Sequence, residues 1–489
     1  MDLFTTVAFV GAFMYLIKIL KKAYISPTSS IPGPFLARFT KLWELNEAVK
    51  GSFEKKNLAL HRKYGRIVRI APSTFSINDP AAVKEIYSAG TKFVKSDFYH
   101  AFGSPDPEQG DLFSERDSKR HSLKRRKVAS LYSMTTLISY EKFVDRCNQE
   151  LCSKFEEFSD DGRAFELPAW MQFYAFDVIG EITTGEPFGF MRQGYDFNGI
   201  LDAIDQSMIY GSRIGIFPEL HGLLAGIMRA ANQRIPFDTI ADYIRHHIGR
   251  RNTQGNFDAA AQQDFLTKLL SLQEAQKIDA LDTFTTMGAN IAAGSDTTAI
   301  SLTTVIYALI KNPSAAQKLR EEVDFFEAEG KLSDPVTFKQ AQNMPYLQAC
   351  IKEALRIHPA TGRPLVRKVP VEGATLAGQF FPGGSSVGAN PWVIHFNEEI
   401  FGPDAMLFRP ERWLHNKEKL SLMEQNFLSF GWGARSCIGK NISLLEISKL
   451  IPQLYRRFDF ISAEPGAEWE TSTHWFVKQK FICLVKPRT

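Results

Sequence analysis

The chain has 489 residues, of which 44% are hydrophobic and 39 are phenylalanine, so it carries ample apolar material for a large buried core. Its 58 lysines and arginines nearly balance its 54 aspartates and glutamates, and the net charge of +4 argues against a nucleic-acid-binding surface. The five cysteines include no Cys-x-x-Cys pair, which argues against a disulfide framework, a zinc site and an iron–sulfur cluster and favours a reducing compartment. Such a length usually divides into two or three domains, although one large unit built around a cofactor is also compatible with it.

The N-terminal end of the chain predicts a membrane anchor. Residues Leu3–Leu20 are almost wholly apolar and would form a helix about 27 Å long, close to the roughly 30 Å hydrocarbon core of a bilayer. Lys21 and Lys22 follow this run and only Asp2 precedes it, so the positive-inside rule keeps the body of the protein on the cytoplasmic side. A cleaved secretory signal is the competing interpretation, but a basic start and an evident cleavage site are missing. We therefore predict an anchor over residues 1–22.

A proline-rich segment, residues 23–34, joins the predicted anchor to the rest of the chain. Pro27, Pro32 and Pro34 restrict the backbone and predict a stiff hinge, although an ordinary linker can have the same composition. We expect a single domain over residues 35–489.

Most of this domain predicts helices, with a small β region near its start. Residues 66–72 and 73–78 alternate well enough to form the two strands of a hairpin. The stretch from Tyr99 to Ser114 is rich in glycine and proline and predicts a long loop, which we place at the entrance of a binding site. Residues 147–274 are mainly helical in pattern. The expected fold class is therefore mainly α with a small β region.

A basic run lies between Lys119 and Lys127. His121 and Arg125 are four residues apart within it and would share one face of a helix. A solvated helix face is the simplest interpretation of the run. A nuclear-import patch and a docking surface for an acidic protein partner are also compatible with it.

A long helix is predicted over residues 282–312, because Pro313 ends an extended helical pattern. Its middle contains Asp296 and Thr297, an acid followed by a hydroxyl in otherwise apolar surroundings. Burial of an acid costs free energy unless the acid has partners or a function. This pair could hold water and relay protons to an oxygen bound beside the helix. The alternative is a polar kink whose hydroxyl is satisfied by the helix backbone.

Four charged residues further along the chain are also candidates for a structural or binding role. Glu353 and Arg356 lie three residues apart on one predicted helix, a common pair worth a few tenths of a kcal/mol in isolation. Arg412 lies in the sequence Phe-Arg-Pro-Glu-Arg-Trp. Arg367 follows an apolar stretch in a predicted strand, where an exposed strand arginine is an equally good interpretation.

The stretch from Phe430 to Gly439 is the strongest candidate for a functional site. It holds the single cysteine Cys437, with Arg435 two residues earlier, several glycines, and a helical pattern immediately after it. The start of a helix should lower the pKa of a thiol and favour the thiolate, and an arginine suits a planar carboxylate. A macrocycle that carries both an iron ion and propionates would satisfy both groups. The alternative is a buried cysteine in a glycine-rich loop.

The spacing Phe-x-x-Gly-x-Arg-x-Cys-x-Gly resembles the signature of the haem-thiolate enzymes of the cytochrome P450 family. The Ala-Gly-x-Asp-Thr-Thr sequence around Thr297 resembles the oxygen-activation motif of that family. The pair Glu353 and Arg356 and the later Arg412 resemble its buried charge triad. Residues 62–66, 358–362 and 390–395 look most like filamentous-fungal members, including the pisatin demethylase-like group.

The resemblance implies a P450 fold, with one large haem-binding domain behind a transmembrane helix, and roles for particular residues. Cys437 would bind the iron of haem b, and Phe430 would pack beside the thiolate. Thr297 would position protons that Asp296 feeds. The haem propionates would be held by the cations and the histidine, namely Arg435, Arg125, Arg367 and His121, although histidine stands where tryptophan is commoner in the family.

The implied activity is monooxygenation. One oxygen atom from O₂ would enter a small apolar organic substrate by hydroxylation, demethylation or epoxidation, with electrons from NADPH through an NADPH-cytochrome P450 reductase at the endoplasmic reticulum membrane. Fungal relatives of this type serve secondary metabolism or detoxification. A haem-thiolate isomerase or dehydratase without a reductase is one alternative, against which the intact pair of Asp296 and Thr297 argues. A non-catalytic haem-binding or membrane-scaffold protein is the other.

Overall fold

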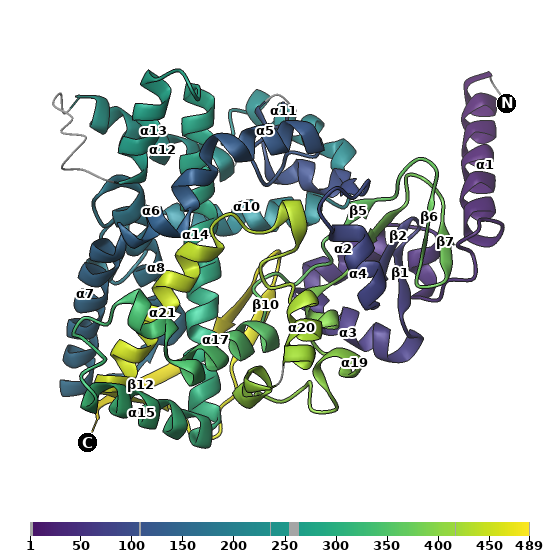
Figure 1. Ribbon diagram of the computed structural model, residues 1–489. Coiled ribbons are helices and arrows are strands. Elements are labelled where there is room, and N and C mark those ends of the chain that lie inside the picture. The colour runs from purple at the N-terminus through teal and green to yellow at the C-terminus, as the bar shows by residue number, and fades with distance from the viewer. Residues whose placement is uncertain (1–2, 107–108, 235, 254–263, 416, 489) are drawn as a thin grey trace.

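The computed structural model describes residues 3–106, 109–234, 236–253, 264–415 and 417–488. A large helical part packs against a smaller part that carries the main sheet, and the N-terminal helix projects away from both (Figure 1). The predicted class, mainly α with a small β region, is confirmed. The α-helices of the described residues are α1 (Leu3–Tyr24), α2 (Leu42–Lys50), α3 (Phe53–Tyr64), α4 (Pro80–Tyr87), α5 (Ser118–Val128), α6 (Met134–Ile138), α7 (Glu141–Asp160), α8 (Leu167–Thr184), α9 (Phe190–Gln193), α10 (Ile200–Ile214), α11 (His221–Ala230), α12 (Pro236–Thr253), α13 (Phe265–Glu274), α14 (Ala280–Lys311), α15 (Pro313–Ala328), α16 (Phe338–Gln342), α17 (Pro345–Ile357), α18 (Pro391–Ile394), α19 (Glu398–Phe401), α20 (Lys417–Gln425) and α21 (Lys440–Arg457).

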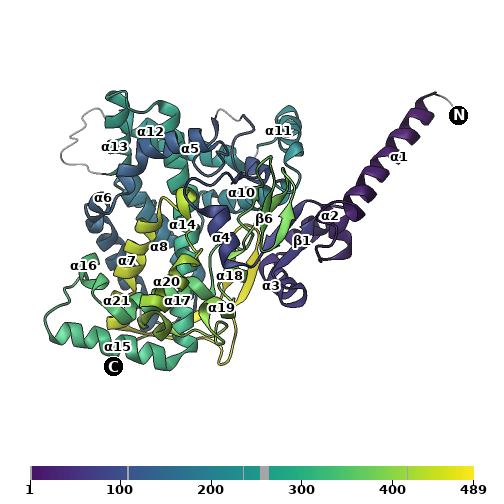
Figure 2. The same cartoon turned by 45° about the vertical axis from the view of Figure 1, so that its right-hand side comes forward.

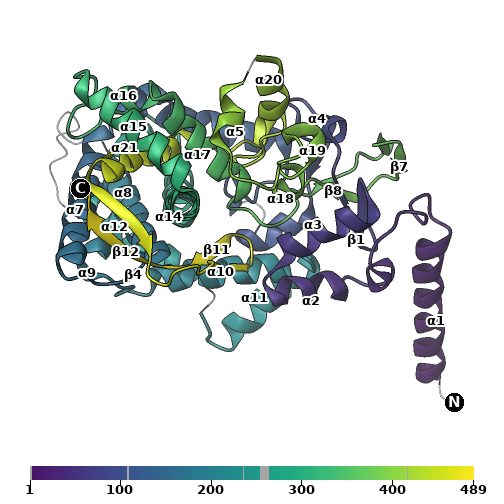
Figure 3. The same ribbon diagram turned by 90° about the horizontal axis from the view of Figure 1, so that it is seen from below.

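Helix α14 runs through the middle of the helical part. It corresponds to the helix predicted over residues 282–312, and its start is fixed by a capping box in which the Asp279 side chain accepts from the Asp282 N–H at 2.7 Å. Figure 3 looks along this helix and shows α8, α17 and α21 around it. Because neighbours surround most of its length, a polar residue in its middle must find a partner inside the protein.

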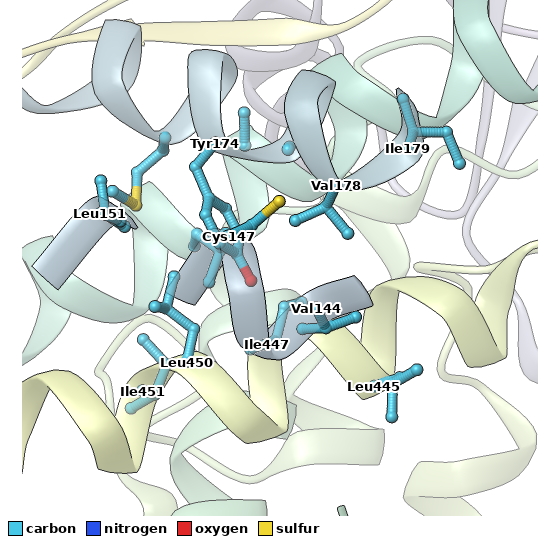
Figure 4. Packing of buried hydrophobic residues seen from close by; sticks show 14 of the residues in the cluster. Val144, Cys147, Leu151, Tyr174, Val178, Ile179, Leu445, Ile447, Leu450 and Ile451 are labelled. Atoms are coloured by element: carbon cyan, nitrogen blue, oxygen red, sulfur yellow. The ribbon is translucent and has the colours of Figure 1, made fainter. Parts of the chain in front are cut away.

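The main core lies between α7, α8 and α21 (Figure 4). Side chains from the three helices interdigitate there, and each of those labelled is at most 1% exposed. Close packing of this kind fixes the position of α21, and with it the loop that precedes α21. The labelled side chains are Val144, Cys147 and Leu151 of α7, Tyr174, Val178 and Ile179 of α8, and Leu445, Ile447, Leu450 and Ile451 of α21.

The main sheet has the strand order β1-β2-β8-β5-β3. Strands β1 and β2 form the predicted hairpin, with Ile67 opposite Ile77. Figure 2 places this sheet on the side of the molecule nearer to α1. The strands are β1 (Ile67–Ala71), β2 (Thr74–Ile77), β3 (Val94–Lys95), β4 (Phe165–Glu166), β5 (Arg367–Lys368), β6 (Ala374–Leu376), β7 (Gln379–Phe381), β8 (Ser386–Gly388), β9 (Phe458–Ser462), β10 (Glu470–Thr473), β11 (Val477–Lys480) and β12 (Ile482–Pro487).

The N-terminal helix and the proline-rich segment differ in how they contact the body. Helix α1 projects into solvent with its apolar side chains exposed, and among the described residues Phe4–Tyr24 is the one helix long and apolar enough to cross a membrane. The proline-rich segment is docked on β1, where the Arg69 N–H donates to the Pro32 carbonyl at 2.8 Å. A Cβ on Gly33 would lie 2.4 Å from the Arg69 carbonyl oxygen, so only glycine permits this approach.

The segment from Tyr99 to Ser114 differs from the predicted loop, because it starts within a 3₁₀ helix, η2 (Asp97–Phe102). Phe102 of η2 packs so closely on α10 that a Cβ on Gly211 would lie 2.6 Å from its ring. Aromatic packing against α10 therefore holds the first four residues in a helical turn. The described residues from Gly103 to Ser114 form no strand and no α-helix, in keeping with the predicted loop.

Glu353 joins Arg356 and Arg412 in a fully buried triad. Glu353 Oε1 accepts from Arg356 Nη2 at 2.7 Å and from Arg412 Nε at 2.9 Å, and all three side chains are at most 1% exposed. Trp413 Nε1 donates to the other carboxylate oxygen at 2.9 Å. The triad ties α17 to the 3₁₀ helix η6 (Pro410–Leu414), so its role is structural, as the sequence predicts.

Candidate active site

The Cys437 loop connects α20 to α21 and contains a 3₁₀ turn, η7 (Gly433–Arg435). Gly433 has φ +62° and approaches the end of α4, since a Cβ there would lie 2.1 Å from the Tyr87 carbonyl oxygen. The Cys437 N–H donates to the Phe430 carbonyl at 2.8 Å and closes the loop. The loop is therefore closed by its own backbone and lies tightly against the end of α4.

The Cys437 sulfur opens into a space inside the protein. Its side chain is exposed, whereas the other four cysteines are buried. Burial nevertheless raises the pKa of the Cys437 thiol, and the N–H groups of Gly439 and Lys440 and the charge of Arg125 lower it by less. The expectation that the start of α21 would leave this pKa lowered is wrong, although the predicted N–H groups do face the sulfur.

Helix α14 presents a second accessible patch next to this loop. Ala293 is exposed in the middle of α14, although Ile291 and Ser295 are fully buried. Thr298 Oγ1 and Ser443 Oγ, 2.8 Å apart, join α14 to α21 immediately after the cysteine loop. An exposed residue on a helix that is otherwise enclosed indicates an internal space beside it.

Thr297 lies one turn after Ala293 on the same face of α14. Its hydroxyl donates to the Ala293 carbonyl at 2.9 Å. This is the backbone-satisfied arrangement that the sequence left open as an alternative. The hydroxyl still has its acceptor capacity for a further partner in the adjacent space.

Asp296, about 100° around the helix axis from Thr297, faces a different direction and is 1% exposed. Its two oxygens have different partners: Gln172 Nε2 of α8 donates to Oδ1, and Lys478 Nζ of β11 lies 3.2 Å from Oδ2. Lys478 also contacts Asp205 of α10 at 3.0 Å. Burial lowers the pKa of Lys478, but the two carboxylates outweigh it and the net shift is upward.

A cavity of about 400 Å³ lies on this side of α14. It is lined by residues of α8, α10 and α14 and by Lys478 and Gln479 of β11, and Asp296 forms part of its wall. Polar side chains supply much of the lining, so water can enter. Asp296 thus borders a polar cavity on one side of α14, while Thr297 borders the internal space on the other.

Arg435 and Arg125 hold the cysteine loop against α5 and the residues that precede it. Arg435 donates to the carbonyls of Glu115 and Arg116, at 2.6 and 3.1 Å, and Arg125 donates to the Ser436 carbonyl at 2.7 Å. The predicted helix that carries Arg125 is α5. Both guanidinium groups therefore bind neutral carbonyl oxygens.

Arg367 and Lys95 lie opposite each other on β5 and β3. They are 5% and 7% exposed, so Arg367 is a buried residue and the exposed alternative does not hold. Arg367 Nη1 donates to the Tyr99 hydroxyl at 3.4 Å, and Lys95 Nζ lies 4.3 Å from the centre of the Tyr99 ring. The sheet thus adds two buried cations to the site.

These cations and His121 are crowded and lack anionic partners. Burial, followed by the charges of Arg435, Lys95, Arg125 and Arg367, lowers the pKa of His121 to about 3. Burial and Arg367 also lower the pKa of Arg435 to about 10. No ion pair joins any of the five to a carboxylate in the described part of the chain. A dianionic ligand would relieve this uncompensated charge.

Comparison with known proteins decides the family. The family model described as "Cytochrome P450" matches residues 31–484. The chain belongs to the cytochrome P450 family. This P450 is 41% identical to a pisatin demethylase of Fusarium vanettenii over 471 residues, which cover 95% of this chain and 90% of the relative. It is 35% identical to the cytochrome P450 monooxygenase cicH of Emericella nidulans over 474 residues, or 94% of each chain.

P450 enzymes are haem-thiolate monooxygenases that use O₂ and receive electrons from a redox partner, so haem is the cofactor of this chain. The site has the features that haem requires. An accessible cysteine faces an internal space beside α14, and buried cations without carboxylate partners lie at its edge. The donor set fits an iron ion with one sulfur ligand and two propionates.

Sequence analysis of this P450 missed three residues of the site. Lys95 lies among the predicted propionate-binding residues, and Gln172 and Lys478 bind Asp296. None belongs to a motif around the cysteine or in α14. The signals that could have drawn attention to them are weak: a lysine within a short apolar strand, and a charge next to the apolar tip of the last hairpin.

Proposed function

We propose that this P450 is a membrane-bound monooxygenase that inserts one oxygen atom from O₂ into a small apolar organic substrate in fungal secondary metabolism. The observation that carries the proposal is the Cys437 sulfur, which opens into the internal space bordered by Ala293 and Thr297. When bound, haem with a thiolate ligand supplies the O₂ activation and O–O cleavage.

The residues around the haem site have distinct roles. Cys437 would bind the haem iron through its sulfur, and Phe430 packs in the core beside it, with its carbonyl accepting from the Cys437 N–H. Arg125, Arg367 and Arg435 would hold the propionates. His121 and Lys95 would join them, because the same anions would relieve the burial of these two side chains among cations.

Asp296 and Thr297 act together in proton delivery from two neighbouring faces of α14. Asp296 borders the polar cavity and exchanges protons with water there, while Lys478 and Gln172 fix its orientation. Thr297, whose hydroxyl donates to the Ala293 carbonyl, accepts a hydrogen bond from a water molecule at the internal space and so positions that water as the proton donor. A haem-thiolate isomerase would have no use for a buried acid linked to a hydrated cavity in this way.

Asp296→Asn is expected to lower kcat by about 100-fold with little change in KM, because the amide cannot release a proton. Substrate-dependent product formation and NADPH oxidation measure the effect, and the solvent isotope effect on kcat should increase. Asp202→Asn is the matched control, since Asp202 lines the same cavity but is exposed and does not contact Asp296. Equal effects of the two substitutions would rule out a specific proton route through Asp296.

An aromatic cap covers the substrate side of the internal space. We define it as Phe98, Tyr99, Phe102, Phe113 and Trp475. Trp475, at the tip of the last hairpin, lies 5.0 to 5.9 Å from the other four rings, measured between ring centres. The cap packs with Ile300, one turn after Thr297 on α14. Such walls suit an apolar substrate. The name of the Fusarium relative adds demethylation to hydroxylation and epoxidation as expected reactions.

The electron donor is NADPH-cytochrome P450 reductase at the endoplasmic reticulum membrane. Residues 1–22 form the anchor and residues 23–34 the hinge, with residues 35–489 as the catalytic domain on the cytoplasmic side. The exposed apolar side chains of α1 support the anchor. The basic face of α5 serves as the docking surface, because α5 also carries Arg125 and His121 of the haem site and its Arg126 is exposed.

The test compares two ways of reducing the haem under carbon monoxide. Full-length protein reduced chemically should give the long-wavelength Soret band of a thiolate-ligated haem, and NADPH with reductase should give the same band. Arg126→Glu should raise the reductase concentration for half-maximal reduction rate about tenfold at low salt. Lys486→Glu is the control, because Lys486 is exposed and belongs to β12, which lies far from α5 (Figure 1).

A band formed by chemical reduction but never by NADPH and reductase would exclude that electron donor and favour an isomerase or dehydratase. An unchanged reductase dependence in Arg126→Glu would leave the basic run as a solvated helix face.

A further inference from the structure

Lys478 of β11 lies between the carboxylates of two different helices. Its Nζ is 3.0 Å from Asp205 Oδ1 of α10 and 3.2 Å from Asp296 Oδ2 of α14. Burial lowers the pKa of Lys478, but Asp296 and Asp205 raise it by more, so the two carboxylates share one fully charged ammonium group. A change in the position of either helix therefore changes how that group is divided between them.

The three side chains meet at the polar cavity of about 400 Å³ beside α14, where water can replace their contacts. The side chains of Lys478 and Asp205 are 28% and 37% exposed, and a lysine has a flexible stem of four carbons, so the ammonium group can move between its partners. Asp296 Oδ2 is buried without a hydrogen-bond partner, and the ammonium group of Lys478 lies next to it. Movement of that group towards Asp205 would open Oδ2 to water of the cavity.

The strand that carries Lys478 is tied to α14. Gln479, the next residue of β11, donates through Nε2 to the Ile300 carbonyl at 3.1 Å and to Thr304 Oγ1 at 3.0 Å. These acceptors lie about one and two turns after Asp296 on the same helix. The backbones of Lys478 and Asp296 therefore keep their relative position when other elements move.

Helix α10, which carries Asp205, packs instead on the aromatic cap. A Cβ on Gly215, at the end of α10, would lie 2.6 Å from the Phe98 carbonyl oxygen, and one on Gly211 would lie 2.6 Å from the ring of a second cap residue. Such close contacts make α10 and the cap move together. A substrate that takes up space under the cap therefore sets the distance from Asp205 to Lys478.

We propose that Asp205 is a positioning residue that acts on Asp296 through Lys478 and makes proton delivery depend on how closely α10 covers the substrate. With α10 closed, Asp205 draws the ammonium group away from Asp296, and cavity water reaches Oδ2. With α10 open, Lys478 binds Asp296 alone and covers that oxygen. The inference rests on the proposed monooxygenase function and describes the regulation of the same site. The step is a proton transfer from cavity water to Oδ2, and solvent replaces the proton.

The first experiment measures the reactivity of Lys478 in full-length holoenzyme. Sulfo-N-hydroxysuccinimidyl acetate acetylates the neutral form of an amine, and mass spectrometry of the peptides gives the rate for each lysine. Asp205→Asn should speed acetylation of Lys478 about fivefold, because loss of one carboxylate raises the neutral fraction. Lys480 is exposed on the same strand and is the internal control, whose rate should not change. An unchanged rate at Lys478 would overturn the proposal.

The second experiment follows NADPH oxidation and demethylation of 2-methoxynaphthalene with reductase. Asp205→Asn should lower the rate of NADPH oxidation about fivefold and increase its solvent isotope effect, while Asp205→Glu should retain most of the rate. In the Lys478→Met background, Asp205→Asn should change neither quantity, because Asp205 acts only through Lys478. Asp202→Asn is the matched control, since Asp202 lines the same cavity one turn earlier on α10 and is exposed. Additive effects of Asp205→Asn and Lys478→Met would contradict the proposal.

The two experiments separate this proposal from the monooxygenase function. Acetylation needs no turnover, so it reports the shared ion pair even in an inactive protein. Absence of NADPH oxidation in the wild type would contradict the monooxygenase function and, with it, the role of the pair in proton delivery. An active enzyme in which Asp205→Asn leaves the rate and the solvent isotope effect unchanged would overturn the role of Asp205 alone.

Discussion

Replacing Cys437 with serine is expected to abolish both the long-wavelength Soret band and all NADPH-dependent product formation. The reason is that thiolate electron donation to the iron, which favours O–O cleavage, depends on this one sulfur atom. The spectrum of the reduced protein under carbon monoxide measures the first effect, and product formation with reductase measures the second. Haem content should stay measurable, because Arg125, Arg367 and Arg435 remain in place.

Cys350→Ala provides the matched control for this result. Cys350 is fully buried on α17, where burial and nearby glutamates raise its pKa far above the usual range, so it is an inert thiol. Its loss should cost about 1 kcal/mol of stability and leave the Soret band unchanged. A long-wavelength band in Cys437→Ser would show that another residue binds the iron, and the assignment of the site would be wrong.

The parts of the site that sequence predicted well are those in which neighbouring residues act together. The loop around Cys437 and the pair of Asp296 and Thr297 have fixed local spacing, so their residue types imply their geometry. The triad of Glu353, Arg356 and Arg412 depends on one long-range contact, between Glu353 and Arg412. The resemblance of its motifs predicted that contact, and the structure places all three side chains in one buried cluster.

Contacts from distant segments could not be predicted in this way. Lys478 reaches Asp296 from a hairpin almost two hundred positions later in the chain, and Gln172 reaches it from α8. Lys95 meets Arg367 only because β3 and β5 pair in the sheet. Local spacing contains no information about such pairings, which depend on how the helices and the sheet pack together.

The pKa of Cys437 is an electrostatic property that the local sequence also could not predict. The sequence indicated a helix start near the sulfur, and the N–H groups of Gly439 and Lys440 are there. The cost of desolvating a thiolate depends on everything that packs around it. In this loop that cost exceeds the stabilisation of the thiolate by the N–H groups and by Arg125. The direction of the net shift therefore required the tertiary structure.

Glu353→Gln is expected to destabilise the protein by about 3–5 kcal/mol, because it leaves the buried guanidinium group of Arg356 without a countercharge and leaves Arg412 with Asp404 alone, at 3.0 Å. Arg356 also donates to the backbone carbonyls of His395 and Ala405, at 2.7 and 2.6 Å, so loss of its position would disturb the segment that leads to the cysteine loop. Chemical denaturation measures the free energy of unfolding, and haem retention measures the effect on the loop.

Glu399→Gln is the matched control, since it makes the same change in an ion pair with Arg66 at 3.0 Å in which both side chains are exposed. Screening by water and salt limits such a pair to about 0–1 kcal/mol. The difference between the two substitutions isolates the contribution of burial, because the chemistry of the replaced group is identical. If Glu353→Gln cost no more than Glu399→Gln, the triad would not be essential to the fold, and the geometry of the Cys437 loop would have to depend on its own backbone contacts with α4 and α21.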